Sequence, residues 1–428
     1  MFTNIAMIEF KSWINTRNIQ VAPLTGFFGA NSSGKSSILQ MLIMLKATID
    51  SSNRNVLLET NIKDYVELGT LHDIVNNKGA GITLFVEWHL DYPLRINDIL
   101  LPQLEFIVTI GVYHEDKTQR LIEFTYAHTK ADKKVLSASM GRRDKKNYVS
   151  LIINDNEVKF TNDNVGEPIK SYGFSSEAIN ACADVLHLND LVLALEQQFA
   201  RVYHLGPVRE YTHRNYGWGG DRPSDVGRMG ERSILALLAG GEAMISKIAY
   251  WLKEMGLSAS FNIKKIIGTT YQVELTHIGS EKPVLLPDMG FGVSQVLPVL
   301  VACYYAPEGS TLLIEQPEMH LHPSAQSVLA DMFIEVMRER KVQLIIESHS
   351  EHLLARLQRR MAEAVLDVNQ TAFYFCQLRD GESHITPLEM DEYGEIKNYP
   401  DDFFGDLTGD VFERARMSIE RRMQQVSE

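Results

Sequence analysis

The most informative stretch of the chain is Gly29-Ala30-Asn31-Ser32-Ser33-Gly34-Lys35-Ser36. An apolar run, 24–28, precedes it and another, 37–45, follows, so this GxxxxGK[ST] pattern stands between an expected strand and an expected helix. Glycines let backbone N–H groups curl around a phosphate, and the helix N-terminus adds partial positive charge. Lys35 would reach the β- and γ-phosphates, and the Ser36 hydroxyl would contact Mg²⁺. This P-loop predicts nucleotide binding. The residues expected to bind nucleotide are Asn31, Ser32, Ser33, Gly34, Lys35, Ser36 and Ser37.

The composition is typical of a globular protein with an acidic surface. The 428 residues are 45% hydrophobic and 23% charged, enough for a large core. Acidic residues outnumber basic ones by 55 to 42, and the net charge of −13 disfavours a generic nucleic-acid coat. No signal peptide or apolar run of about 18 residues is visible, so we expect a cytoplasmic protein without a membrane segment. Three scattered cysteines indicate neither disulfides nor a zinc site.

The order of the expected elements indicates an α/β fold of the P-loop type. Residues 311–314 and 343–346 have the pattern of buried strands, and helical patterns follow them at 324–340 and 351–360. This alternation is typical of a mainly parallel sheet with helices, in which ligands bind beyond the carboxyl ends of the strands. A β-rich stretch lies between the P-loop helix and these elements. We interpret it as an antiparallel β subdomain inserted over residues 80–165.

We expect residues 1–428 to form a single head with further subdivisions. Residues 176–260 combine helical patterns with many arginines, and residues 365–428 combine a hairpin, signalled by Asp380-Gly381, with a charged helix. The segment Arg209–Arg232 is a basic cluster in an acidic chain. It is either a solvated loop with internal salt bridges or a surface that contacts nucleotide, nucleic acid or an acidic partner. Its arginines are Arg209, Arg214, Arg222, Arg228 and Arg232.

The order of motifs resembles the ABC-type ATPases of the SMC and OLD-like group, soluble relatives of transporter ATPases. Within that group three strings resemble a bacterial subfamily with a C-terminal domain of unknown function. These strings are Ile314-Glu315-Gln316-Pro317-Glu318-Met319-His320-Leu321-His322-Pro323, Gly206-Pro207-Val208-Arg209-Glu210 and Phe403-Phe404-Gly405-Asp406. The resemblance covers nearly the whole chain. Several members of the wider group act in phage defence or beside nucleases.

The resemblance implies ATP and Mg²⁺ as cofactors and a homodimer or higher oligomer. In that group two protomers sandwich two ATP molecules, and each site joins one P-loop to the partner's signature loop. The implied functional region, 286–360, would place Glu315 at the Walker B carboxylate, where it holds Mg²⁺ with Ser36, and His349 at the switch histidine. The signature would lie at 290–295, which departs from LSGGQ; a helix N-cap loop is the alternative. Its nucleotide-contacting residues would be Gly292, Ser294 and Gln295.

The position after the Walker B carboxylate, normally a glutamate that activates water, holds Gln316. A neutral amide can orient water but cannot accept its proton, and general-base catalysis is typically worth ~10²–10⁴-fold. We therefore expect slow hydrolysis. Two substitutes remain open: Glu318 could act as the base, or Glu315 could do so while the metal is held elsewhere.

Two other interpretations of this region are weaker. Four histidines have ligand-like spacings, but no nearby cysteine completes a zinc set. They are His320, His322, His349 and His352. The serines at 348–350 lack the GxSxG elbow of a hydrolase.

The sequence thus predicts an ATP-binding and ATP-hydrolysing switch. Mg–ATP would close a homodimer, and a partner effector such as a nuclease in anti-phage defence would sense the closed state. One alternative is a non-hydrolytic ATP-gated scaffold, for which Gln316 is the main support. Another is an SMC-like DNA-repair ATPase that grips DNA, against which the missing coiled-coil heptads argue.

Overall fold

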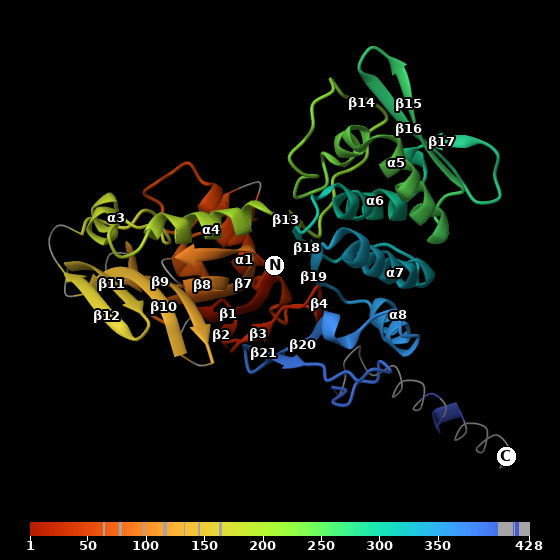
Figure 1. Cartoon of the computed structure of the whole chain (residues 1–428). Coiled ribbons are helices and arrows are strands. Elements are labelled where there is room, and N and C mark those ends of the chain that lie inside the picture. The colour runs from red at the N-terminus through yellow and green to blue at the C-terminus, as the bar shows by residue number, and fades with distance from the viewer. Residues whose placement is uncertain are drawn as a thin grey trace.

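The fold is described from a computed structural model of the whole chain (Figure 1). The described residues are 1–62, 65–76, 79–96, 99–113, 118–131, 133–143, 146–161, 165–400, 414 and 416–418. The motif Phe403-Phe404-Gly405-Asp406 and most of the predicted C-terminal charged helix lie outside them.

A six-stranded sheet forms the centre, in the order β13-β18-β19-β4-β20-β21. All neighbours pair in parallel except β21, which pairs antiparallel with β20. Both β18 and β19 are buried along their whole length, as expected of parallel strands covered on two faces. The predicted α/β fold with a mainly parallel sheet is confirmed. The strands are β13 Val202–Leu205, β18 Thr311–Glu315, β19 Gln343–Glu347, β4 Leu24–Gly29, β20 Thr371–Arg379 and β21 Glu382–Pro387.

Helices cover both faces of this sheet, and the sheet separates two hydrophobic cores. Side chains alternate along a strand, so Phe27 joins one core and its neighbour Phe28 joins the other. The first core contains residues of the P-loop helix α1, and the second contains residues of α6, α7 and α8. In Figure 1 the last three stack on the right-hand side of the sheet. These helices are α1 Lys35–Asp50, α6 Phe291–Tyr305, α7 Pro323–Arg340 and α8 Glu351–Ala362.

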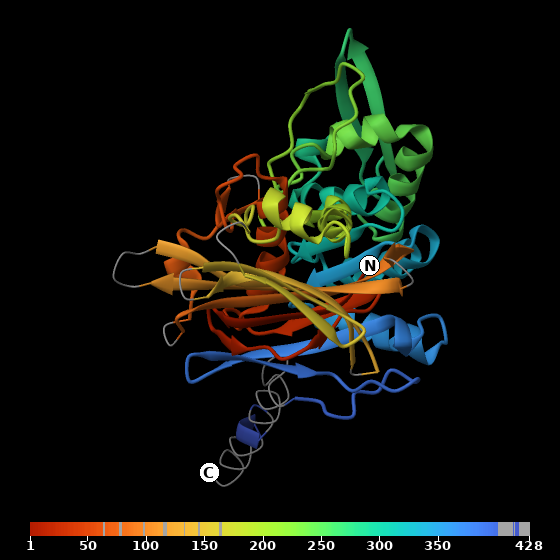
Figure 2. The same cartoon turned by 60° about the vertical axis from the view of Figure 1, so that its left-hand side comes forward.

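The antiparallel sheet is larger than the insertion expected over residues 80–165. Among the described residues it has nine strands, in the order β12-β11-β10-β9-β8-β7-β1-β2, with β3 also paired to β1. Strand β7 pairs with β1 through Ile5 and Val86, because both strands bury apolar residues in the same core. The expected inserted subdomain is therefore continuous with the N-terminal strands. In Figure 2 this sheet runs across the molecule above the β20–β21 hairpin.

The strands of the antiparallel sheet are β1 Phe2–Phe10, β2 Trp13–Asn15, β3 Ile19–Gln20, β7 Gly81–Ile96, β8 Ile99–Tyr113, β9 Thr118–Lys130, β10 Lys133–Arg143, β11 Lys146–Ile153 and β12 Asn156–Thr161. The smaller strands are β5 Asn61–Ile62, β6 Val66–Glu67, β14 Tyr216–Gly217, β15 Ser260–Ile267, β16 Thr270–Thr276 and β17 Pro283–Leu285. The remaining helices are α2 Leu71–Ile74, α3 Ser176–Cys182, α4 Leu188–Ala200, α5 Ser233–Glu254 and two 3₁₀ turns, Leu286–Asp288 and Val368–Gln370.

Helix α5 is the one described helix that is long and apolar enough to cross a membrane by length and composition alone. No such segment was expected from the sequence. A core helix of a globular protein passes the same test, and α5 packs against α6 and β15. Its helical geometry is interrupted at Gly241, where φ is 75° and ψ is −170°.

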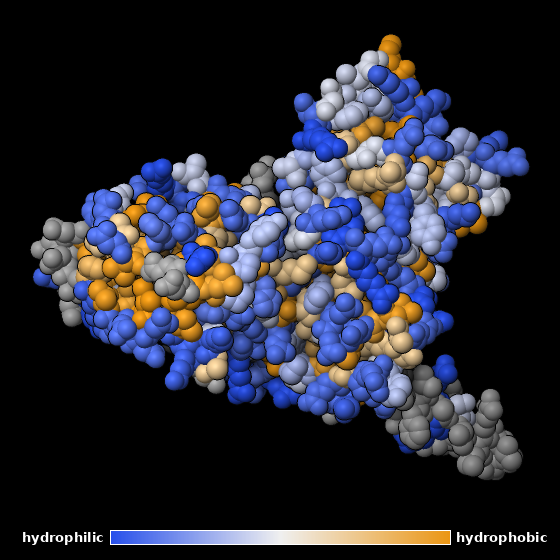
Figure 3. Space-filling model, in the orientation of Figure 1, coloured by the Kyte–Doolittle hydropathy of each residue, from blue (hydrophilic) through white to orange (hydrophobic). Residues whose placement is uncertain are grey.

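Apolar residues also gather on part of the surface. Figure 3 shows them over the antiparallel sheet at the left, while hydrophilic residues dominate most of the same face. Exposed large apolar side chains of this sheet include Ile122 and Val158. Contiguous apolar surface of this kind often marks an interaction site.

Candidate functional site

The P-loop connects β4 to α1 by a turn that only glycine fits at its first position. Gly29 has a φ of +134°, and a Cβ there would lie 2.0 Å from the carbonyl oxygen of Cys376. Gly34, with a φ of +91°, accepts a hydrogen bond at its carbonyl oxygen from the indole N–H of Trp13, at 3.1 Å. Helix α1 then begins at Lys35. Contacts with Cys376 of β20 and Trp13 of β2 therefore fix the shape of the turn.

The Lys35 ammonium lies inside this turn. Its Nζ donates to the carbonyl oxygens of Gly29 at 3.1 Å and Ala30 at 2.6 Å, and to the hydroxyl of Ser33 at 3.3 Å. Burial lowers the pKa of Lys35, while the nearby Glu347 carboxylate acts in the opposite direction. Of the other predicted P-loop residues, Ser33 and Ser37 are buried, and Asn31 and Ser32 are exposed.

The Ser36 hydroxyl donates to Oε1 of Glu347 at 3.0 Å. Glu347 ends β19, the strand next to β4, and only 3% of it is exposed. Burial and the Glu315 carboxylate together raise the pKa of Glu347 to about 7, although the Ser36 hydrogen bond opposes this shift. Glu347 was not predicted from the sequence. The available signal was its position, since it follows residues 343–346 just as Glu315 follows 311–314.

Glu315, the predicted Walker B carboxylate, lies one strand farther from the P-loop. Its Oε1 lies 2.8 Å from Nε2 of His204, and both side chains are almost fully buried. The guanidinium of Arg209 donates to the main-chain oxygen of Glu315 at 3.0 Å, and burial lowers the pKa of Arg209 to about 10. His204 was not predicted, because nothing in the strand sequence 202–205 marks a polar partner.

Glu318, after β18, and His349, after β19, are brought together, and the main chain of Gln316 contacts the end of β19. The backbone N–H of His349 donates to Oε1 of Glu318 at 2.7 Å. Burial raises the pKa of Glu318, and burial together with Lys35 lowers the pKa of His349. The backbone N–H of Gln316 donates to the carbonyl oxygen of Glu347 at 2.8 Å, and its φ is 46°.

The predicted signature segment lies on the other side of the sheet from α1. Gly290, with a φ of 108°, precedes α6, and the Ser294 hydroxyl is 3.4 Å from its carbonyl oxygen. Ser294 and Gln295 are buried, and a Cβ at Gly292 would approach the carbonyl oxygen of His320 to 3.1 Å.

Phe291 is the outward-facing residue of this segment. Its side chain is 47% exposed, and its ring centre lies 4.7 Å from His320 and 6.2 Å from Tyr211. This aromatic group gives the segment an exposed apolar surface.

The basic cluster Arg209–Arg232 is largely engaged within the chain. Arg209 is buried against Glu315, Arg214 forms a bidentate ion pair with Asp288 at 2.8 and 3.0 Å, and Arg232 pairs with Asp225. These contacts favour the interpretation as a loop held by internal salt bridges.

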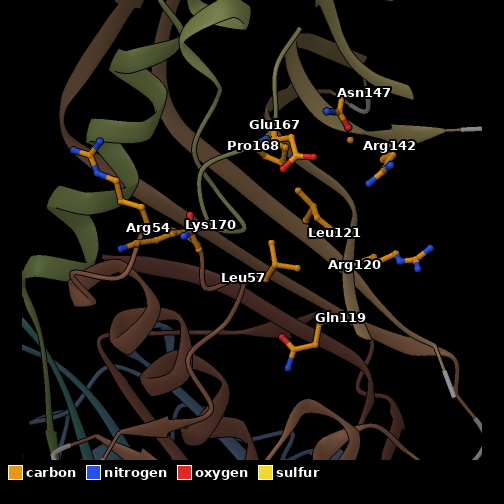
Figure 4. A pocket seen from close by; sticks show the side chains of 12 residues that line it. Arg54, Leu57, Gln119, Arg120, Leu121, Arg142, Asn147, Glu167, Pro168 and Lys170 are labelled. Carbon is orange, nitrogen blue, oxygen red and sulfur yellow. The ribbon is translucent and has the colours of Figure 1, made fainter. Parts of the chain in front are cut away.

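A separate hollow of about 300 Å³ lies in the antiparallel part of the molecule (Figure 4). Arg54 lies at one side of it, and Arg120 and Arg142 lie at the other. Lys170, which also lines it, donates to the carbonyl oxygens of Thr48, Ile49 and Ser51 at the end of α1. None of its lining residues belongs to the P-loop or to the loops after β18 and β19.

The residues near the P-loop fit Mg–ATP. Buried carboxylate oxygens of Glu318 and Glu347 have no hydrogen-bond partner among the described residues. Mg²⁺ is usually held by one or two carboxylates, waters and substrate phosphates. Ser36, Glu347 and Glu315 could supply the protein oxygens. In the described part of the chain, no group of three or more His, Cys, Asp or Glu residues could hold a metal ion alone.

A P-loop at the carboxyl edge of a parallel sheet, with acidic residues at the ends of the adjacent strands, defines a P-loop ATPase. A family profile described as "AAA domain, putative AbiEii toxin, Type IV TA system" matches residues 73–355. The chain belongs to this family, and the predicted membership in a family of P-loop ATPases is confirmed. A second profile, described as a protein of unknown function, matches residues 366–413. The segments that these two profiles match both lie C-terminal to the P-loop.

Solved structures with a similar course are head domains of SMC proteins. An SMC head bound to the C-terminal winged-helix domain of ScpA has a TM-score of 0.47 and 13% identity, covering 91% of this chain and 98% of that one. The SMC head domain from Thermotoga maritima has a TM-score of 0.42 and 10% identity, and the match covers 91% of this chain and 99% of that one. A third structure is an SMC head with an extended coiled coil, bound to the C-terminal domain of ScpA derived from Pyrococcus furiosus. It has a TM-score of 0.44 and 12% identity, and the match covers 91% of this chain and 96% of that one. No curated protein sequence matches significantly.

Proposed function

We propose that the protein is an ATP-driven switch that binds Mg–ATP, hydrolyses it slowly and controls a partner effector. The observation that carries this proposal is the convergence at one sheet edge of the P-loop pair Lys35 and Ser36 with Glu347, Glu318 and His349. A nucleotide seated on the P-loop would place its terminal phosphate at this edge.

Each residue has a definable task in this proposal. Bound Mg²⁺ would offset phosphate charge and orient the terminal phosphate. Lys35 supplies a buried cation, and His349 supplies an imidazole ring beside the P-loop. The raised pKa of Glu318 makes it a better proton acceptor than an ordinary carboxylate, so it is our candidate base. Gln316 can orient water only.

A homodimer would complete the site. The signature residues Gly292, Ser294 and Gln295 lie across the sheet from α1, so one chain does not join them to its own P-loop helix. The exposed Phe291 and Tyr211 support an interface at this segment, since exposed aromatic residues are enriched at such surfaces. ATP would then be buried between two protomers.

The effector is proposed to be a protein, such as a nuclease, in cytoplasmic anti-phage defence. The family description names an AbiEii-type toxin and a type IV toxin–antitoxin system, which supports a role with a partner. The apolar surface over the antiparallel sheet (Figure 3) supports protein contact there.

The deciding experiment is multiple-turnover ATP hydrolysis by the purified protein, with Lys35→Ala as the blank. Turnover by the wild type but not by Lys35→Ala is expected, and Glu318→Gln should lower turnover by about 10²-fold or more while ATP binding persists. Unchanged turnover in Glu318→Gln would remove Glu318 from the chemistry.

A non-hydrolytic scaffold is the second candidate, and Gln316 favours it. In that case the wild type binds ATP without turnover, and Gln316→Glu gains activity because it restores a proton acceptor at the usual position. The same assay therefore separates the two functions.

A further inference from the structure

We propose that Glu347, rather than Glu315, is the principal acidic residue that holds Mg²⁺ beside Ser36. This inference rests on the proposed function, because it concerns the magnesium ion of bound Mg–ATP. It assigns a metal-binding role to a residue that the motif pattern alone does not mark.

The first observation is the contact between Glu347 and the P-loop. Oε1 of Glu347 lies 3.0 Å from the Ser36 hydroxyl, the group that P-loop proteins direct at Mg²⁺. Two oxygens at this separation can share one octahedral ion, whose ligands lie about 2.0–2.1 Å from the metal.

The second observation is an unpartnered buried oxygen. Glu347 is 3% exposed, yet its Oε2 has no hydrogen-bond partner among the described residues. Leaving a carboxylate oxygen buried without a partner is unfavourable, so such an atom points to a ligand that completes it. A cation beside Ser36 would do so.

The third observation is the different situation of Glu315. Strand β19 lies between β18 and β4, so Glu315 is two strand spacings from the P-loop strand, roughly 10 Å, whereas Glu347 is one. The Oε1 atom of Glu315 is already 2.8 Å from His204. Glu315 is therefore the more distant of the two carboxylates, and it is paired in register with Glu347.

The test measures how much Mg²⁺ strengthens ATP binding. A fluorescent ATP analogue is titrated into each protein in excess Mg²⁺ and in excess EDTA, and the ratio of affinities is the magnesium enhancement. Glu347→Gln should reduce this enhancement about tenfold or more while binding in EDTA is kept. Glu315→Gln should reduce the enhancement less than Glu347→Gln does, and Glu157→Gln on the exposed surface of β12 is the matched control that should keep it.

Manganese supplies a direct readout of the metal. Electron paramagnetic resonance with Mn²⁺ and ATP should show weakened metal binding in Glu347→Gln. Ser36→Ala should show a similar defect, and the double variant should lose less than the sum of the two single losses, because both residues hold one ion. Additive losses in the double variant would overturn the proposal.

Other outcomes are equally decisive. Loss of the enhancement in Glu315→Gln but not in Glu347→Gln would overturn this inference while leaving the proposed function intact. Failure of the wild type to bind ATP in either buffer would instead reject the proposed function. Melting curves check folding, and if Glu347→Gln does not fold, Glu347→Asp replaces it; an enhancement equal to that of the wild type would again contradict the proposal.

Discussion

Gly29 fixes the shape of the P-loop at the scale of single residues. Replacing Gly29 by Ala would put a methyl group against the Cys376 carbonyl at a positive φ. We expect unfolding free energy to fall by about 1–3 kcal/mol and ATP binding to be lost. Urea denaturation measures the first effect. Gly219→Ala is the control, because a Cβ there meets nothing within 4 Å; equal midpoints for the two variants would contradict the argument.

His204 is the residue that makes a buried Glu315 tolerable. His204→Ala would leave Oε1 of Glu315 without its 2.8 Å partner in a nearly water-free position. We expect a loss of about 1–3 kcal/mol in the free energy of unfolding. The exposed His213→Ala should change it by less than about 0.5 kcal/mol. Denaturant titration of both variants measures the free energy of unfolding. A similarly small loss in the two variants would show that the buried contact does not stabilise the protein.

Among the elements, helix α1 depends on a lysine from a distant segment. Lys170 donates to three carbonyl oxygens at the C-terminal end of α1, where a cation also favours the helix dipole. Lys170→Met should therefore destabilise the protein by about 2–3 kcal/mol.

The surface pair of Lys159 and Glu157 provides the control for this prediction. Lys159→Met should cost no more than about 1 kcal/mol, because exposed ion pairs contribute little. Chemical denaturation compares the two variants, and equal unfolding midpoints would refute the role of Lys170.

Elements encoded by local pattern were predictable, and contacts between distant elements were not. The P-loop, the strands at 311–314 and 343–346, and the hairpin at Asp380-Gly381 follow from periodicity and turn residues, and the structure confirms these strands and this hairpin. The pairing of β1 with β7 joins segments about eighty residues apart, so no local signal marks it. The Ser36–Glu347 and His204–Glu315 contacts could not be predicted for the same reason. The sequence shows each of these residues, but it does not show which distant residue each one contacts.

The whole molecule carries a net charge of −13, and several arginines of its basic cluster are paired internally. Any binding to DNA should therefore be weak and disappear between about 50 and 200 mM salt. Filter binding at both salt concentrations tests this expectation. Arg214→Gln should change retention little, because Arg214 already faces Asp288; salt-resistant retention that Arg214→Gln abolishes would favour a DNA-gripping ATPase.

Assembly is the property of the whole molecule on which the proposed switch depends. In the proposed dimer the exposed Phe291, at the start of α6, meets the partner, whereas ATP binding within one chain uses the P-loop on the other side of the sheet. Phe291→Glu should therefore abolish the dimer that ATP and Mg²⁺ induce, because a charge would be buried at the interface. At a protein concentration low enough to keep the wild type monomeric, the ATP affinity of the variant should stay within about threefold of the wild type. Light scattering after gel filtration measures assembly. Tyr92→Glu, at an exposed aromatic residue of β7, should dimerise normally. A Phe291→Glu protein that still dimerises with ATP would exclude this segment from the interface and would require a different surface to complete the nucleotide site.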